Sequence, residues 1–397
     1  MSSQERADVG RWRKITALGS GRTGSVALCI ELTSPKQAHP SEEKTFPESP
    51  KRVLHAVKRV HRQCITSNEA VQRILQEKKA LEDLRGQHGI VGLRFTSKDD
   101  MNLYFVLEPL LGGPLHRHVR AGPGGHLEMS NVVFYASEIT SAIAHMHTHK
   151  FVHRDIKASN IVLDANGHAK LIDLGCSKQL EFSGGEEGGE GGGEGGGEGG
   201  WRRKSNGDVG ATCGGCYENT YTYCGTPHCM APEMISREGH GLAVDWWALG
   251  ILVHEMWTGE PPFGYGGNYL SHRITAGLSR ETSSKDVAPV GPPEELDNPG
   301  VNMLSENTGK ESDKPGFLPI VRRLLDTDPQ KRLGSTRDAD EVMHHQWFES
   351  VDWARTARLE TNPPPFRKDL GELEYLDGDK TRNGAADVDP DGLFAGF

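Results

Sequence analysis

Short apolar runs typical of strands and longer stretches with helical periodicity both occur in this chain. Strand-like runs begin at Trp12 and cover Ser25–Ile30 and Leu103–Leu107. The last of these is apolar throughout, as in a buried strand. Apolar residues recur at helical spacing over Asn68–Leu84 and Asn131–His149. The chain is therefore predicted to combine strands with helices.

A polar turn joins two further strand-like runs near the middle of the chain. Ile161–Leu163 and Ala169–Ile172 flank a turn with an Asn-Gly pair, which is the strongest short hairpin signal. Side chains just before and just after this predicted hairpin should therefore meet at one point. They include two carboxylates and an amide, from Asp155, Asp173 and Asn160.

Two carboxylates and an amide at one point suit phosphoryl transfer. That reaction needs a carboxylate that orients an attacking hydroxyl and accepts its proton, and oxygen ligands that hold Mg²⁺ on the phosphates. In this interpretation Asp155 is the catalytic base, Asn160 and Asp173 bind the metal ion, and Lys157 neutralises the transferred phosphoryl group. The alternative is a loop that is polar without being catalytic.

A glycine-rich segment near the N-terminus is a second candidate for phosphate binding. Gly19, Gly21 and Gly24, followed by Val26, give G-x-G-x-x-G-x-V, in which backbone N–H groups can close over phosphates without Cβ clashes. Dinucleotide-binding folds share this pattern but open a helix after the third glycine. Here the strand-like run Ser25–Ile30 follows, which favours a hairpin over the phosphates.

Composition narrows the class of protein. The chain has 397 residues, a length that indicates one large or two ordinary domains. Its formal net charge of -10 argues against nucleic acid as the main partner. Seven cysteines without framework spacing favour a reducing compartment. No apolar run is long enough for a membrane span, and the N-terminus lacks a signal peptide or myristoylation site. We expect a cytoplasmic protein, with the nucleus as an additional location.

Three polar inserts interrupt the predicted elements, at about 33–50, 182–220 and 279–316. The second contains a Gly/Glu run and a basic cluster. Its composition cannot bury enough apolar surface to offset the loss of chain entropy, so it is expected to be disordered.

Zinc binding is a minor alternative at two places. Cys213 and Cys216 form a single C-x-x-C without a second pair, which is a weak metal signal. His145, His147 and His149 lie close in sequence, but their spacing does not place all three on one helix face.

Several motifs together resemble a known family. His153–Asn160 reads H-R-D-I-K-A-S-N and is followed by D-L-G from Asp173, His55–Lys58 reads H-A-V-K, and Thr222–Glu233 contains T-x-C-G-T-P and A-P-E. This combination is similar to eukaryotic protein kinases of the AGC group, nearest the cyclic-nucleotide-dependent kinases. The resemblance implies an α+β bilobal fold with an N-lobe at 12–107, a C-lobe at 111–348 and a C-terminal tail at 349–397, after an extension at 1–11.

The resemblance also implies a serine/threonine kinase that uses ATP and Mg²⁺. Lys58 would hold the α- and β-phosphates and pair with Glu77, and Thr226 would contact Asp155 and Lys157. The remaining nucleotide-binding residues would be Leu18, Gly19, Gly21, Gly24, Val26, Ala56, Glu108 and Leu110.

The same resemblance implies an activating phosphorylation site and several structural contacts. Thr222 would be phosphorylated by an upstream kinase, and a phosphate there would face the cations Arg73, Arg154 and Lys178. Glu233 would pair with Arg332, Asp245 would brace the catalytic loop, and Phe394 and Phe397 of the tail would dock on the N-lobe. Protein substrates are the expected partners, and any cyclic-nucleotide control would come from a separate regulatory subunit.

Substrate selection is where the chain departs from the family. Cyclic-nucleotide-dependent kinases recognise arginines before the target serine with acidic residues, and this chain has Pro114, Ser159 and His228 at three of those places, with only Glu255 matching a fourth. We therefore expect a weakened or altered preference for arginine. A pseudokinase scaffold is the alternative from another class, although Lys58, Asp155 and Asp173 are all present.

Overall fold

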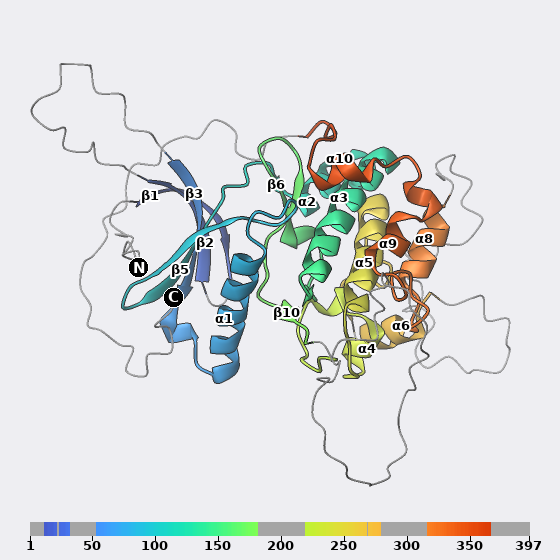
Figure 1. Cartoon of the computed structure of the whole chain (residues 1–397), viewed down its shortest axis with the longest axis horizontal. Coiled ribbons are helices and arrows are strands. Elements are labelled where there is room, and N and C mark those ends of the chain that lie inside the picture. Colours follow the sequence, from blue (N-terminus) through green and yellow to red (C-terminus); the bar gives the residue numbers. More distant parts are fainter. Residues whose placement is uncertain are drawn as a thin grey trace, which may run out of the picture.

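The computed structural model describes residues 12–21, 24–31, 53–181, 219–267, 269–278 and 316–366. These residues form a small lobe rich in strands and a larger, mainly helical lobe (Figure 1), so the predicted α+β bilobal fold is confirmed. The predictions for Phe394, Phe397, Cys213 and Cys216 lie outside the described residues, as do the extension at 1–11 and most of the three inserts.

The N-lobe is built on one antiparallel sheet. Its strands, in the order β1-β2-β3-β5-β4, are β1 (Trp12–Ser20), β2 (Gly24–Glu31), β3 (Val53–His61), β4 (Leu93–Lys98) and β5 (Asn102–Leu107). Strand β2 begins at the third glycine of the glycine-rich segment, so this segment joins two strands and opens no helix. The register places Val26 opposite Lys58.

Helix α1 (Asn68–Asp83) follows a short 3-10 turn, η2 (Arg62–Cys64), and packs beside the sheet (Figure 1). The side chain of Ser67 caps its N-terminus by accepting a hydrogen bond from the backbone N–H of Ala70. Its buried face carries Val71, Ala80 and Leu81 together with one acid, Glu77. A buried carboxylate requires a charged partner, and α1 therefore points Glu77 at the sheet.

The C-lobe consists of helices around a small strand region. Its elements are β6 (Gly113–Pro114), α2 (Leu115–Ala121), η3 (Pro123–Gly125), α3 (Met129–Thr148), β7 (Phe151–Val152), η4 (Ala158–Asn160), β8 (Ile161–Leu163), β9 (Ala169–Leu171), β10 (Lys178–Gln179), η5 (Pro227–Cys229), α4 (Pro232–Ile235), α5 (Ala243–Thr258), α6 (Leu270–Ala276), α8 (Phe317–Leu324), α9 (Ala339–Met343), η7 (Gln346–Phe348) and α10 (Trp353–Ala357). Strands β8 and β9 form the predicted hairpin.

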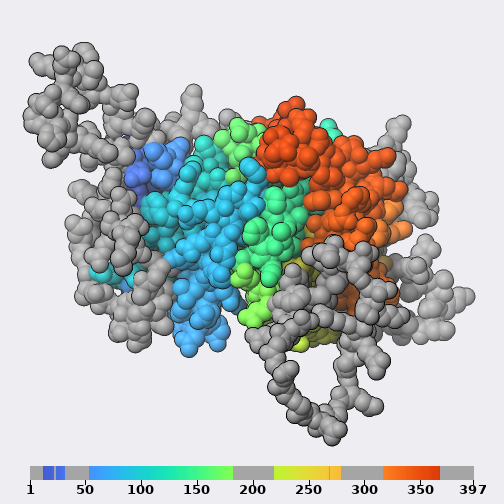
Figure 2. All heavy atoms as spheres, viewed as in Figure 1, coloured from blue at the N-terminus to red at the C-terminus, as the bar shows by residue number. Residues whose placement is uncertain are grey.

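One hydrophobic core runs through both lobes. It joins Leu81 and Leu93 of the N-lobe to Leu174, next to Asp173, and to Trp246 of α5. In Figure 2 the N-lobe residues in blue and cyan lie directly against the green C-lobe segments. The fully buried His153 lies two positions before Asp155 in the chain. Packing therefore ties α1 to the segment that carries the candidate catalytic residues.

A buried ion pair fastens the C-lobe. Arg332 donates to both carboxylate oxygens of Glu233, at 2.7 and 2.9 Å, and its guanidinium lies 5.2 Å from the ring centre of Trp247. Both charged groups are almost fully shielded from solvent. Removing one partner of such a pair leaves an uncompensated buried charge, so this contact ties α4 to the segment that follows α8.

The structure corrects the end of the second predicted insert. Thr220 was placed inside the disordered stretch 182–220, but it is buried and exchanges two backbone hydrogen bonds with His240. Folded structure therefore resumes by residue 219. The residues around Thr220 are as polar as the insert before them, so composition did not show where the folded domain resumes.

The first part of the C-terminal tail packs on the C-lobe. Trp353 of α10 stacks edge-on against Phe348 and donates a hydrogen bond to the backbone oxygen of Met343. Phe366 packs near His118 and the turn at Gly167. None of the helices in the described ranges is long and apolar enough to cross a membrane.

Candidate active site

Asp245 fixes the backbone of the segment His153–Asn160. Its buried carboxylate accepts hydrogen bonds from the backbone N–H groups of His153 (2.7 Å) and Arg154 (2.8 Å). Arg154 has φ of 67°, a left-handed conformation that costs a non-glycine residue on the order of 1 kcal/mol. The two hydrogen bonds offset this cost and set the position of the next residue, Asp155.

His147 bridges Asp245 to Asp338. Its Nε2 lies 3.0 Å from Asp245 and its Nδ1 lies 2.7 Å from Asp338. Burial opposes a charged imidazole, but the two carboxylates prevail and raise the pKa of His147 to about 9. His145 and His149 contact backbone carbonyl groups instead. No group of three metal-ligating side chains occurs among the described residues, and the three histidines do not meet.

The carboxylate of Asp155 gathers the predicted catalytic residues. One oxygen accepts hydrogen bonds from the backbone N–H (2.8 Å) and the hydroxyl (2.6 Å) of Thr226. The other accepts from the ammonium of Lys157 and the side-chain amide of Asn160, both at 2.9 Å. Lys157 also donates to the Thr226 hydroxyl. The loop and the segment that begins at Thr222 thus converge on one carboxylate.

Lys58 connects the two lobes. Its ammonium lies 2.5 Å from Glu77 on α1 and 3.3 Å from Asp173 in the C-lobe. Burial would favour the neutral amine, yet the two carboxylates raise the pKa of Lys58 well above its usual value. The residue is therefore a fixed cation at neutral pH. Of the three glutamates of α1, which are Glu69, Glu77 and Glu82, it is Glu77 that pairs with Lys58, as expected from the sequence.

Asp173 and Asn160 are suitable ligands for a magnesium ion. Burial raises the pKa of Asp173, but Lys58 and the N–H of Gly175 outweigh it and hold the pKa below its usual value, so the group is ionised. About half of its side chain remains exposed. Asn160 uses its amide nitrogen for Asp155, which leaves its oxygen as an acceptor. Two oxygen ligands suit Mg²⁺, which completes its shell with water and substrate phosphates.

The glycine-rich segment approaches strand β3 closely at one point. A Cβ on Gly24 would lie 1.9 Å from the backbone oxygen of Arg59, whereas Cβ atoms on Gly19 and Gly21 would face open space. Gly24 is therefore required for packing, and the other two leave room above the sheet. Leu18 on β1 is 39% exposed, beside this open space.

The connection between the lobes carries the remaining predicted nucleotide-binding residues. Glu108 and the buried Leu110 follow directly after β5, and Ala56 is buried on the adjacent strand β3. The side chain of Glu108 accepts hydrogen bonds from the backbone of Gly92 (2.8 Å) and from Lys170 (2.5 Å). Lys170 lies in β9, so this carboxylate links the hinge to the C-lobe, which the sequence did not predict.

Comparison with known proteins agrees with this geometry. The chain matches the protein kinase domain family over residues 44–348. It belongs to that family. It is 31% identical over 303 residues to the cAMP-dependent protein kinase catalytic subunit PRKX of Homo sapiens, covering 76% of this chain and 66% of that protein. The Mus musculus protein of the same name is 29% identical over 368 residues, with 91% and 79% covered.

A fly relative is similar over a smaller share of its length. The cAMP-dependent protein kinase catalytic subunit 3 of Drosophila melanogaster is 27% identical over 351 residues, which cover 88% of this chain and 46% of that protein. The chain thus spans about half the length of the fly relative and about two thirds of the human one. The resemblance to kinases seen in the sequence motifs is confirmed.

The cations predicted around Thr222 face Thr220 in this kinase domain. Arg154 and Lys178 donate to the hydroxyl of Thr220, at 3.2 and 3.3 Å. Thr222 is exposed, and its hydroxyl lies 3.5 Å from that of Thr220. Arg73 is exposed on α1. Arg154 and Lys178 therefore form a cationic cluster at Thr220, a buried threonine that the sequence did not single out and that lies between the cluster and Thr222.

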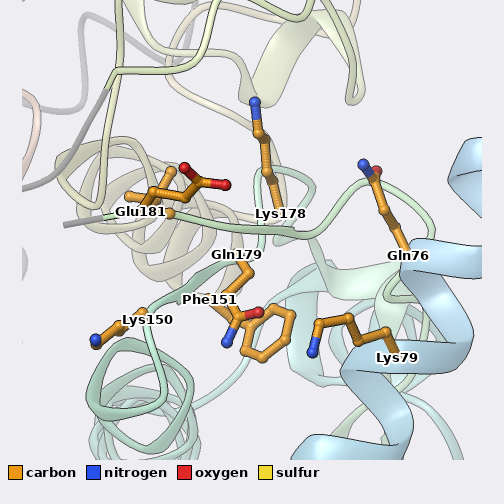
Figure 3. Close-up of a pocket in the computed structure, with 8 residues that line it drawn as sticks. Gln76, Lys79, Lys150, Phe151, Lys178, Gln179 and Glu181 are labelled. Carbon is orange, nitrogen blue, oxygen red and sulfur yellow. The ribbon is translucent and has the colours of Figure 1, made fainter. Parts of the chain in front are cut away.

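A pocket that is lined in part by Lys178 of this cluster lies between α1 and strands β7 and β10. It is lined by Gln76, Lys79, Lys150, Phe151, Lys178, Gln179, Leu180 and Glu181. Figure 3 shows the Lys178 side chain directed away from Phe151, consistent with its contact to Thr220. None of the proposed catalytic residues lines this pocket.

The positions expected to select substrates carry no free acid. His228 packs edge-on against Tyr265, with ring centres 5.1 Å apart, and Tyr265 donates a hydrogen bond to Glu255 at 3.0 Å. Burial raises the pKa of Glu255. Pro114 lies in β6 and Ser159 is exposed. The single matching acid is thus already engaged by a tyrosine that the sequence did not identify.

The charge on His147 makes stability depend on pH. The pKa of His147 is about 9, above the usual value of 6.5. The charged imidazole therefore stabilises the fold fully below about pH 6.5, and this stabilisation is lost as the pH rises toward 9. The difference between the two pKa values corresponds to roughly 3 kcal/mol of unfolding free energy at most. We expect His147→Asn to lose this contribution, measured as the free energy of unfolding in urea at pH 6 and pH 9.

His344→Asn is the matched control, because His344 is exposed and pairs with Asp340 on the surface. If the unfolding free energy of His147→Asn changed between pH 6 and pH 9 by as much as that of the wild type, the assignment would be contradicted.

Proposed function

We propose that this protein is a serine/threonine kinase that transfers the γ-phosphate of ATP to a hydroxyl of a protein substrate. The observation that carries the proposal is the carboxylate of Asp155, which is shared by Lys157, Asn160 and Thr226. Family membership supports ATP as the phosphate donor. Lys58, Asp155 and Asp173 are all present, and nothing in the described part of the chain favours the scaffold alternative.

Each residue has a chemical role in this proposal. Asp155 orients the attacking hydroxyl and accepts its proton, while Lys157 lies beside it to neutralise charge on the transferred group. Lys58, held by Glu77, binds the α- and β-phosphates. A magnesium ion bound through Asn160 and Asp173 would neutralise the charge of the β- and γ-phosphates.

Asp155→Ala tests the central assignment. Loss of the base and of its contacts to Lys157 and Thr226 should lower the turnover number by about 10²–10⁴-fold. Because Asp155 takes no part in the contacts of Lys58 with Glu77 and Asp173, Mg-ATP should still raise the thermal unfolding temperature of the variant. Phosphoryl transfer to a degenerate Ser/Thr peptide library measures the first effect. Full activity in the variant would disprove the assignment.

We infer that Thr222 is the activating phosphorylation site. It is exposed, as a site of phosphorylation must be. Its hydroxyl lies 3.5 Å from that of Thr220, which accepts hydrogen bonds from Arg154 and Lys178. A phosphate on Thr222 would add charge-assisted hydrogen bonds to those cations and hold Thr226 on Asp155.

Thr222→Ala should therefore lower turnover about tenfold or more, since it removes those charge-assisted bonds. Thr220→Val is the matched variant, because Thr220 is buried and is not accessible to another kinase. Phosphopeptide mapping should find phosphate on Thr222 in the wild type and in Thr220→Val. Phosphate on Thr220 alone would refute the inference.

We also propose that the protein has a weak preference for arginine before the target residue. His228 stands where the family has an acid, and Glu255 is occupied by Tyr265. Burial and the nearby Lys157 lower the pKa of His228, so the ring is neutral and neither attracts nor repels arginine strongly.

His228→Glu should increase the selection of arginine in the peptide library about tenfold, because a charge-assisted hydrogen bond contributes about 1.5–3 kcal/mol. His344→Glu makes the same change of residue at an exposed site on the far end of the C-lobe and should leave the selection unchanged. Strong arginine selection by the wild type would contradict the proposal.

A further inference from the structure

An exposed tyrosine lies beside the segment that carries Thr226. Tyr265 belongs to the loop between α5 and α6 and is 45% exposed. Its ring packs edge-on against His228, with ring centres 5.1 Å apart. His228 belongs to η5, which begins at the residue after Thr226, and the Thr226 hydroxyl donates to the carboxylate of Asp155 at 2.6 Å. The two rings therefore lie close to the place where a target hydroxyl must bind.

A short stretch of a bound peptide reaches from Asp155 to these rings. Thr226 and His228 are two positions apart, so the chain between them spans about 7 Å at most. The ring of Tyr265 is one ring contact farther. Because an extended peptide advances about 3.3–3.6 Å per residue, a side chain roughly two to four residues from the target residue can contact Tyr265.

The loop that carries Tyr265 is held on both sides of that residue. Phe263, two positions earlier, stacks on Trp247 with ring centres 5.7 Å apart. Arg273 of α6 donates to the backbone oxygens of Phe263 (3.0 Å) and Gly266 (2.8 Å). The exposed ring is therefore already fixed in place. A ligand that packs on a fixed ring loses less conformational entropy than one that must first order a mobile side chain.

The charges around the two rings offset one another. The Tyr265 hydroxyl donates to the buried carboxylate of Glu255 at 3.0 Å. Of the exposed charged groups nearby, Glu260 raises and Arg120 lowers the pKa of Tyr265. The lowered pKa of His228 keeps its ring neutral. Neither sign of charge on a ligand is strongly favoured, and the aromatic rings are the main surface that a ligand can contact.

We propose that Tyr265 and His228 together select a large apolar side chain of the protein substrate, at one position two to four residues from the target serine or threonine. The proposal rests on the kinase activity proposed above and names a class of substrate for it. A side chain that packs on two rings leaves water and gains aromatic contacts. Tyr265 also engages Glu255, so the same residue supplies the apolar surface and withholds a carboxylate from arginine.

The first test measures peptide binding, which needs no turnover. Each peptide carries alanine in place of the target serine and a single leucine or phenylalanine at one of the four positions on either side. Binding is followed by fluorescence anisotropy with Mg²⁺ and a non-hydrolysable ATP analogue. At one position the apolar residue should tighten binding about tenfold relative to the alanine parent. Equal binding of all these peptides by the wild type would overturn the proposal.

Two substitutions of Tyr265 separate its ring from its hydroxyl. Tyr265→Ala should remove the preference for the apolar peptide, because the ring is gone. Tyr265→Phe keeps the ring and should retain most of that preference. Met101→Ala is the control, since it removes a side chain of similar exposure, 39%, from the turn between β4 and β5, and it should leave the preference unchanged. Loss of the preference in the control as well would contradict the assignment to Tyr265.

The second test is phosphoryl transfer to the degenerate peptide library. The wild type should select apolar residues at the position found by binding. Tyr265→Ala should select arginine there instead, because the Glu255 carboxylate has lost its partner and can accept a charge-assisted hydrogen bond. A tyrosine that only supported the fold would lower turnover on every peptide without changing the selected residue, and that result would refute the proposal.

The two proposals fail in different ways. A wild type that transfers no phosphate, but binds apolar peptides in a manner that depends on Tyr265, disproves the kinase activity and supports the aromatic surface as a peptide site. A wild type that transfers phosphate equally well whichever residue occupies each of the eight positions supports the kinase activity and disproves the selection.

Discussion

The buried carboxylate of Asp245 is the constraint on which the catalytic geometry depends. A charged group without solvent must be fully hydrogen-bonded, and here its partners are two backbone N–H groups and the imidazole of His147. Because those N–H groups belong to His153 and Arg154, the carboxylate keeps Arg154 in a left-handed conformation. The position of Asp155, and through it those of Lys157, Asn160 and Thr226, follows from this requirement.

The side chain of Arg154 links this catalytic loop to two other segments of the chain. Its guanidinium donates to the carbonyl oxygen of Cys176 and to the hydroxyl of Thr220. One residue thus connects the braced loop to the segment after Asp173 and to the segment before Thr222. A change in charge near Arg154 therefore acts on all three segments.

Much of this site could be predicted from sequence, because its key residues lie in short motifs with fixed spacing. The hairpin around Asn166-Gly167 is predictable from local sequence, and its pairing of Ile161 with Leu171 brings the chain after Asn160 beside the chain before Asp173. The helix that carries Glu77 was predictable from its apolar period, and the choice of Glu77 on that helix came from the resemblance to kinases. The pairing of Glu233 with Arg332, 99 positions apart, came instead from resemblance to a family.

Contacts that depend on packing between distant elements were not predictable in the same way. Asp338 contacts His147 across 191 positions, and no local pattern distinguishes it from a solvated acid. Tyr265 engages Glu255 through a loop with no periodic signal. Thr220 resembled the polar insert before it, and only its pairing with His240 shows that it belongs to the folded domain.

The contact between Lys58 and Asp173 has a thermodynamic consequence for the whole molecule. Lys58 belongs to the sheet of one lobe and Asp173 to the other, so their 3.3 Å contact exists only when the lobes are closed. Linkage requires that a ligand which binds the closed form more tightly also favours closure, by the same factor by which closure favours the ligand. A substitution that loosens the lobes therefore weakens the binding of each ligand that prefers the closed form, however far the substitution lies from that ligand.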